Sequence, residues 1–303
     1  MSKANNTVSG SLIFFILHFS FLMFYSCTAP IDIDTDDSDP VIVIYGAITD
    51  EMKQQEIRIS RSSPYFQNEP NTPVSRAIVI IESSDNKRYE LFEPEANPGL
   101  YVSSSEWAVV PGVTYNLRVS VDFDGDGNPE NYDASTTVAA KMELDSVKLD
   151  PMNIMGHKNY ALNIYGEETP GRDHYLFKYI LNDTPVTTKI SKYVIYGDMG
   201  INDLYLDGLT IDYFDHIDNW ESDSDDQRKH STYLKPGEIL VVETAKIPEG
   251  YYNFIDQCQK EMHGENPVFG GPASNITTNI SGGGAGFFCG YCISQIPTTV
   301  PNF

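Results

Sequence analysis

The chain has 303 residues, with 43 Asp and Glu against 20 Lys and Arg, so its formal net charge is −23. This acidity excludes a broad basic surface for nucleic acid or for anionic lipid. The apolar share of 41% is enough to build a core and excludes a disordered chain. The length suits one large domain or two ordinary ones. The 19 Tyr and 15 Phe, with many Val, Ile and Thr, favour strands.

Residues 1–26 predict a signal peptide that carries the protein out of the cytoplasm. The apolar run Leu12–Tyr25 is shorter than the roughly 20 residues that a membrane-spanning helix needs. Ser26 then precedes Cys27, as in a bacterial lipoprotein signal. We therefore expect cleavage before Cys27 and a lipid on its thiol, which anchors the protein to a membrane. The alternative is an ordinary secretory signal with an incidental Cys, because bulky aromatic residues precede Ser26.

Residues 27–39 form a short acidic tether. Its acids resemble in part a surface-export signal of Bacteroidota lipoproteins, although Ile and Thr are interleaved with them: Asp32, Asp34, Asp36 and Asp37. The alternative is that the sequence IDID begins a strand.

Residues 40–140 predict an immunoglobulin-like β-sandwich. Short strand patterns recur there with turn signals between them, at 41–49, 55–62, 77–83, 87–93, 114–123 and 131–138. The clearest is 114–123, which alternates strictly, so that five apolar side chains face one side: Tyr115, Leu117, Val119, Val121 and Phe123. We expect 77–83 and 87–93 to form a hairpin, and 131–138 to pair with 114–123.

Residues 141–303 predict a second β-rich domain, which 141–150 connects to the first. Strand patterns lie at 160–166, 174–182, 187–197, 204–214 and 238–247, with an acidic loop at 221–226. One helix is expected over 248–263. Its apolar stripe should pack against the second sheet: Tyr251, Phe254, Ile255, Cys258 and Met262. The predicted fold class is mainly β, with two β-sandwich-like domains and one helix in the second.

Three cysteines follow Cys27 in the chain: Cys258, Cys289 and Cys292. Outside the cytoplasm thiols oxidise, and an odd number allows one disulfide with one thiol left over. Two residues three apart on a strand point to opposite faces, so only one of the tail pair faces the helix. We predict a disulfide between Cys258 and Cys289, with Cys258–Cys292 as the alternative, because Cys292 lies nearer the fraying end of the chain. The spacing of Cys289 and Cys292 also suits a redox pair, but the strand–helix context of such a site is missing.

The segment 122–133 is a candidate calcium loop. Its oxygen-bearing residues fall at positions 1, 3, 5, 7, 9 and 12 of a twelve-residue loop: Asp122, Asp124, Asp126, Asn128, Glu130 and Asp133. The flanks look like strands rather than the helices of an EF-hand, and the last Asp is shorter than the usual Glu. The alternative is a solvated hairpin turn, since Asp, Gly and Asn are turn formers.

The sequence contains no GxSxG, HExxH or phosphate-loop motif, so we predict that the protein is not an enzyme. Trp107 and Trp220 are candidates for stacking on sugars. A core role is favoured for Trp107, whereas Trp220 borders the acidic loop.

Together these landmarks resemble a family of Bacteroidota lipoproteins known as the domain of unknown function 4249. The likeness rests on the lipoprotein signal, on VIYGAITDE (43–51), IRISRSSPYFQNEPNTPVSRAIVII (57–81), PGVTYNLRVSV (111–121), LKPGEILVVETAKIPEGYYNF (234–254) and NPVFGGPASNITTNISGGGAGFFCGY (266–291). Two features depart from the family pattern, the Cys pair in the tail and the long Asp-rich loop after Val121.

The resemblance implies an outer-membrane lipoprotein, with the cell surface favoured over the periplasmic face. It also implies a TonB-dependent receptor as partner, because genes of the family often neighbour such receptors. It assigns no reaction, ligand or catalytic residue. We therefore expect an accessory or ligand-binding subunit. The alternatives are a structural or adhesive surface protein and, last, a hydrolase with a site assembled from scattered acids.

Overall fold

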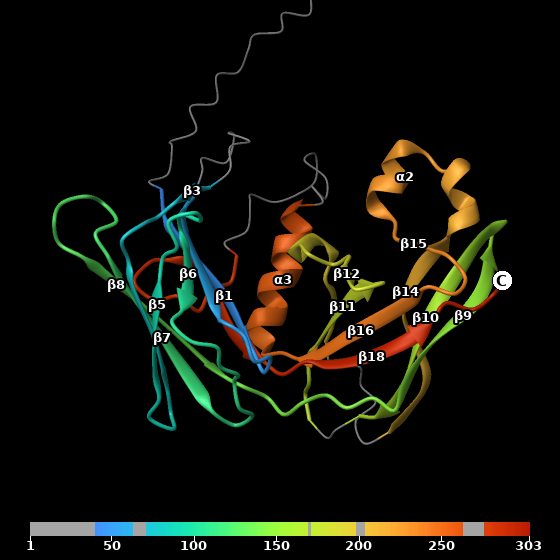
Figure 1. The fold of residues 1–303 in the computed structure, drawn as a ribbon, viewed down its shortest axis with the longest axis horizontal. Helices are drawn as coiled ribbons and strands as arrows, with labels where there is room; N and C mark the ends of the chain where they lie inside the picture. Colours follow the sequence, from blue (N-terminus) through green and yellow to red (C-terminus); the bar gives the residue numbers. More distant parts are fainter. Residues whose placement is uncertain (1–39, 63–70, 169–170, 198–203, 263–275) are drawn as a thin grey trace, which may run out of the picture. The chain divides into compact units, whose positions relative to one another are not determined.

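The computed structural model describes residues 40–62, 71–168, 171–197, 204–262 and 276–303 (Figure 1). The signal peptide, Cys27 and the acidic tether lie outside the described residues, so their roles stay predictions. Residues Pro40–Phe303 form one compact unit. No described helix is both long enough and apolar enough to cross a membrane.

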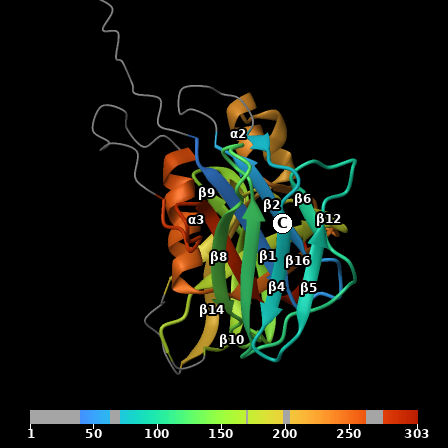
Figure 2. The ribbon, with the colours of Figure 1, turned by 90° about the vertical axis from the view of Figure 1, so that its left-hand side faces the viewer.

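The first sheet has nine strands in the order β17-β1-β2-β6-β5-β4-β7-β8, with β3 paired to β2 (Figure 2). Its strands are β1 (Ile42–Thr49), β2 (Glu56–Arg61), β3 (Thr72–Pro73), β4 (Ile78–Ser83), β5 (Arg88–Phe92), β6 (Leu100–Ser103), β7 (Thr114–Val121), β8 (Glu130–Thr137) and β17 (Ala285–Tyr291). The expected hairpin of β4 with β5 and the expected pairing of β7 with β8 are both confirmed. All strand pairs of this sheet are antiparallel except β1 with β17.

The two ends of this sheet approach each other around a core. The Gly290 amide donates a hydrogen bond to Thr136 Oγ1 at 3.0 Å, which joins β17 to β8. The alternation predicted on β7 is confirmed, because its apolar members are buried in this core: Tyr115, Leu117, Val119 and Val121. Trp107 is also buried there and stacks on Tyr89 with ring centroids 3.8 Å apart, which confirms the core role expected for it. The N-terminal half is therefore a closed, sandwich-like unit.

Strand β17 changes the expected division of the chain. Its residues were assigned to the second domain, yet they pair in parallel with β1 from Val43↔Ala285 to Thr49↔Tyr291. The predicted first domain, 40–140, is thus incomplete without a strand from the tail. An apolar run shows that a segment is buried but not which distant strand it joins.

Two further sheets form the second sandwich. One has the order β15-β14-β10-β9, and the other has the order β12-β11-β16-β18 with β13 paired to β11. Their strands are β9 (Ser146–Ile154), β10 (His157–Glu167), β11 (Tyr175–Leu181), β12 (Thr184–Pro185), β13 (Val194–Tyr196), β14 (Tyr205–His216), β15 (Tyr233–Leu234), β16 (Ile239–Lys246) and β18 (Ser294–Thr299). Side chains such as Leu162 and Phe177 bring both sheets into one core, which confirms a mainly β protein with two sandwich-like parts.

Three local expectations need correction. The segment 141–150 is not only a connector, because β9 begins at Ser146. The strand expected over 187–197 is shortened to β13 by the 3₁₀ helix η1 (Ile190–Lys192). The acidic loop expected at 221–226 contains the end of the 3₁₀ helix η2 (Ile217–Glu221) and the start of helix α2 (Asp225–His230). A capping box between Ser224 and Gln227 explains why α2 forms there.

Helix α3 (Glu249–Met262) forms as predicted and lies between the two sandwiches (Figure 1). Its buried stripe contacts the five-stranded sheet, as expected, but also contacts β17 of the first sheet. Met262, the last residue of the expected stripe, is wrongly placed by the prediction, because it is 62% exposed at the end of the helix. Tyr251 is fully buried, and its hydroxyl forms a 2.8 Å hydrogen bond with the hydroxyl of Tyr45 on β1. The helix therefore joins both halves of the unit through one apolar cluster.

Candidate ligand-binding site

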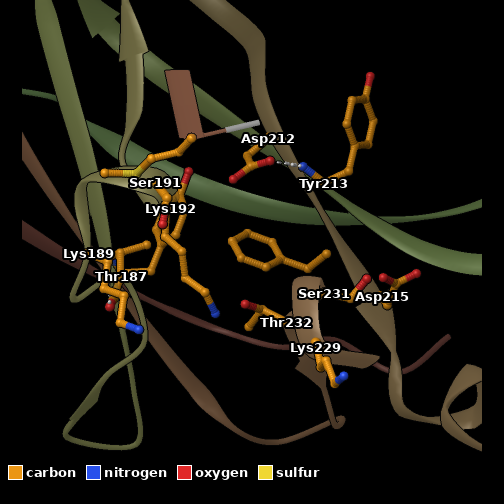
Figure 3. Close-up of a pocket in the computed structure, with 13 residues that line it drawn as sticks. Thr187, Lys189, Ser191, Lys192, Asp212, Tyr213, Asp215, Lys229, Ser231 and Thr232 are labelled. Carbon is orange, nitrogen blue, oxygen red and sulfur yellow. Dashed lines mark hydrogen bonds between the residues drawn. The ribbon is translucent and has the colours of Figure 1, made fainter. Parts of the chain in front are cut away.

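A cavity of about 620 Å³ opens in the second sandwich (Figure 3). Its walls come from β11 (Tyr179), from β14 (212–215), from the end of α3 (Met262) and from two segments, 187–192 around η1 and 229–232 after α2. Figure 3 shows the labelled residues of these two segments on opposite sides. The volume lies in the range of roughly 300–1,000 Å³ that small-molecule sites occupy.

Three lysines line this cavity together with two aspartates, Asp212 and Asp215. Lys189 and Lys192 come from the η1 segment, and Lys229 comes from α2 on the other side. None of them forms an ion pair with a described residue, whereas Lys178 pairs with Glu243 and Lys246 with Asp173. In a chain of net charge −23, a cavity lined by three lysines and two aspartates has a locally positive balance, which favours an anion.

The inner wall holds an acid and a phenol. Asp212 accepts a 2.8 Å hydrogen bond from the Tyr213 amide, and burial raises the pKa of its carboxyl. Tyr179 is 2% exposed and lies beside Asp212, but its hydroxyl has no hydrogen-bond partner of normal geometry among the described residues. Burial and the neighbouring carboxylate raise the pKa of Tyr179 as well. A buried polar group without a partner is rare in proteins and marks a place for a ligand or water.

A β-bulge in β14 aims Asp212 at the cavity. The ladder with β10 pairs Leu162 with Asp212 and Asn163 with Thr210, so Ile211 is skipped. Asp212 shares its face with Phe214, which is buried, while Tyr213 between them is exposed. Bulges are common next to functional sites because they redirect side chains. Here the bulge places a carboxyl on the core-facing side of the strand.

The backbone carbonyl of Ile211, the residue that the β10 ladder skips, has a hydrogen-bond partner. Ile211 O accepts a 2.6 Å hydrogen bond from Tyr196 Oη of β13, on the other sheet. This bond crosses the sandwich from β13 to β14 and stabilises the bulged form of β14.

Comparison with known protein families identifies the chain. A family described as "Domain of unknown function (DUF4249)" matches residues 28–296. The chain belongs to the DUF4249 family. No curated protein sequence matches it. Among solved structures, the FN1–FN3 domains of chicken CNTN1 are similar at 12% identity with a TM-score of 0.26, and the match covers 69% of this chain and 62% of that chain.

The candidate calcium loop of this DUF4249 protein brings three of its six predicted ligands together. The carboxylate oxygens of Asp122, Asp124 and Asp126 lie within 4.8 Å of one another and are exposed. The other two acids are engaged elsewhere: Glu130 accepts a 2.7 Å bond from the Phe123 amide, and Asp133 faces Arg118 at 3.3 Å.

Both of those acids belong to β8 rather than to the turn, which is why they do not converge with the three aspartates. The three aspartates also accept hydrogen bonds from amides of their own turn, for example Gly125 to Asp122 at 2.8 Å. These bonds also suit the alternative interpretation, a solvated hairpin turn. Calcium binding at 122–133 therefore stays a prediction.

The predicted disulfide is absent from the structure, in which Cys258, Cys289 and Cys292 are all free and buried. The expectation that only one of the two tail cysteines faces the helix is confirmed. Cys289 packs with Cys258 in the α3 cluster, whereas Cys292 packs in the first core. Burial raises the pKa of Cys258 and of Cys292 to about 11, and burial also raises the pKa of Cys289. Since the thiolate is the reactive form, these thiols are protected from oxidation.

Sequence patterns did not single out the cavity. Lys189 and Lys192 fell inside an expected strand, and Lys229 followed an expected loop. The usable signal was partial: Lys189 and Lys192 lie in a stretch without acids in an acidic chain, whereas Lys229 follows Asp225 and Asp226 closely. Trp220, a candidate for stacking on sugars, is 45% exposed but does not line this cavity; it packs edge-on against Tyr233 at 5.0 Å.

Proposed function

We propose that this DUF4249 protein is a lipid-anchored binding protein of the outer membrane that captures a small ligand for a TonB-dependent receptor. The observation that carries the binding role is the 620 Å³ cavity with its three lysines free of ion pairs. The buried Tyr179 hydroxyl without a hydrogen bond supports it. Polar groups left unpaired at a cavity are the groups that a ligand can satisfy.

The composition of the cavity favours binding over catalysis. Its described lining residues include no His or Cys, the side chains most often used as general base or nucleophile. Asp212 is half-buried, and its hydrogen bond of normal geometry comes from the Tyr213 amide rather than from a serine or threonine hydroxyl of the described lining. Turnover of a glycan or peptide panel by the purified protein would overturn this part of the proposal.

The anchoring part rests on the signal that ends at Cys27. We expect radiolabelled palmitate to be incorporated into the wild-type protein and to be absent from Cys27→Ala, while Cys292→Ala keeps the label. Label that persists in Cys27→Ala would contradict the anchor. Protease shaving of whole cells then separates the surface, which we favour, from the periplasmic face.

Co-purification tests the partner. Membranes are solubilised in mild detergent and the protein is isolated by an affinity tag. A TonB-dependent barrel in stoichiometric amount supports the accessory role. The absence of any barrel, together with binding of whole cells to a matrix, would replace it with an adhesive role.

A further inference from the structure

The two lysines of the η1 segment act as a pair. Lys189 and Lys192 are three residues apart, and the Lys192 amide donates to the Lys189 carbonyl at 2.9 Å. A 3₁₀ turn has three residues, so side chains at this spacing lie on the same side. Figure 3 shows them across the cavity from Lys229. The positive charges therefore surround the opening rather than gather on one outer face.

Carboxylates share the cavity with these lysines. Asp212 and Asp215 both line it, and among the described residues the Asp215 carboxylate accepts a long 3.4 Å bond from Asn219. A phosphate or sulfate accepts hydrogen bonds and is repelled by carboxylates at short range. A sugar hydroxyl both donates and accepts, so it can bond to Asp and to Lys together. The mixed lining thus favours a ligand that carries hydroxyl groups in addition to its negative charge.

The remaining residues of the lining suit a ligand with a ring of modest polarity. Four Ser and Thr side chains and three aromatic ones complete the lining, the aromatic ones being Tyr179, Tyr213 and Phe214. Tyr179 and Phe214 pack edge-on at 5.0 Å and form a rigid apolar surface. Ligand sites typically combine such apolar walls with a few placed polar groups.

We infer that the cavity binds a carboxylated saccharide, with its carboxylate held by the lysines and its hydroxyls bonded to Asp212 and Asp215. This rests on the proposed binding function and names its ligand class. The Tyr179 hydroxyl gains its missing hydrogen bond from the ligand. Affinity falls with added salt, because the charge contact is near the surface.

Calorimetry on the full-length protein in detergent tests the inference. The probes are glucuronate, galacturonate and N-acetylneuraminate, each beside its uncharged methyl ester. We expect at least one acid to bind. Its methyl ester should bind with an affinity at least about tenfold lower, because it loses a charged hydrogen bond. Lys192→Gln should cause a similar loss, whereas Lys235→Gln, an exposed lysine outside the cavity, should leave the affinity unchanged.

Tyr179→Phe is the second variant, because it removes a buried hydroxyl that has no hydrogen bond of normal geometry to a described residue. It should keep the melting temperature and weaken the acid's binding. Failure of all three acids to bind at millimolar concentration, equal binding of acid and ester, or no effect of Lys192→Gln would each overturn the inference. Co-purification of the receptor does not depend on this titration, so the proposed function and the ligand class fail separately.

Discussion

A single methyl group at Gly286 should break the parallel pair that closes the first sandwich. Gly286 lies opposite Ile44 in the β1–β17 ladder and has a φ of +97°. A Cβ there would meet the Ile44 carbonyl oxygen at 2.1 Å and its carbon at 2.8 Å. Both are backbone atoms, so no side-chain rotation relieves the clash, and β17 must move away from β1.

Gly283 provides the matched control. It lies in the same tail with a φ of +79°, and a Cβ built on it meets nothing within 4 Å. Gly283→Ala should therefore cost only the backbone strain, about 1–2 kcal/mol. Gly286→Ala adds steric displacement, which in packed regions costs about 1–3 kcal/mol, so its total should reach roughly 2–5 kcal/mol. That is a large share of the roughly 5–15 kcal/mol that typically stabilises a domain.

Urea unfolding of the non-lipidated chain, with Cys27→Ala in every sample, measures both variants. Tryptophan fluorescence reports the first sandwich because Trp107 is buried in its core. We expect a clearly lower midpoint for Gly286→Ala than for Gly283→Ala, with the wild type highest. Equal midpoints for the two variants would refute the argument from close backbone approach.

Three further outcomes are expected. If calcium binds the aspartate turn, millimolar calcium raises the melting temperature by mass action, and Asp124→Asn with Asp126→Asn removes both this rise and the heat of binding in calorimetry. Cys289 is fully buried with a raised pKa, so a thiol reagent at pH 8 should modify it only after unfolding; non-reducing peptide maps with a Cys258–Cys289 bridge would contradict the free thiols. Burial raises the pKa of Asp212, so the folded state binds its proton more tightly and stability falls as pH rises from the unfolded pKa of about 3.9 through the folded value. Asp212→Asn should thus melt above the wild type at pH 7 and converge with it in acid, and a lower melting temperature at pH 7 would contradict this.

Local pattern was sufficient for much of the fold. The strict alternation at 114–121 predicted which side chains of β7 are buried, because successive side chains on a strand point to opposite faces. The apolar stripe after Pro248 predicted α3 to within a residue at each end, since helical spacing is also a local property. The burial of Trp107 in the first core was also predicted from the sequence.

The tertiary structure alone decided the features that join distant segments. Strand β17 pairs with β1, although more than half of the chain separates them in sequence. An apolar run does not indicate which strand it will pair with. The lysines around the cavity come from the η1 segment and from the end of helix α2, which look unrelated in sequence. The bulge at Ile211, which directs Asp212 into the cavity, depends on the ladder with β10. Hydrophobic periodicity reports whether a side chain is buried, whereas a site depends on which buried and exposed surfaces the folded chain brings face to face.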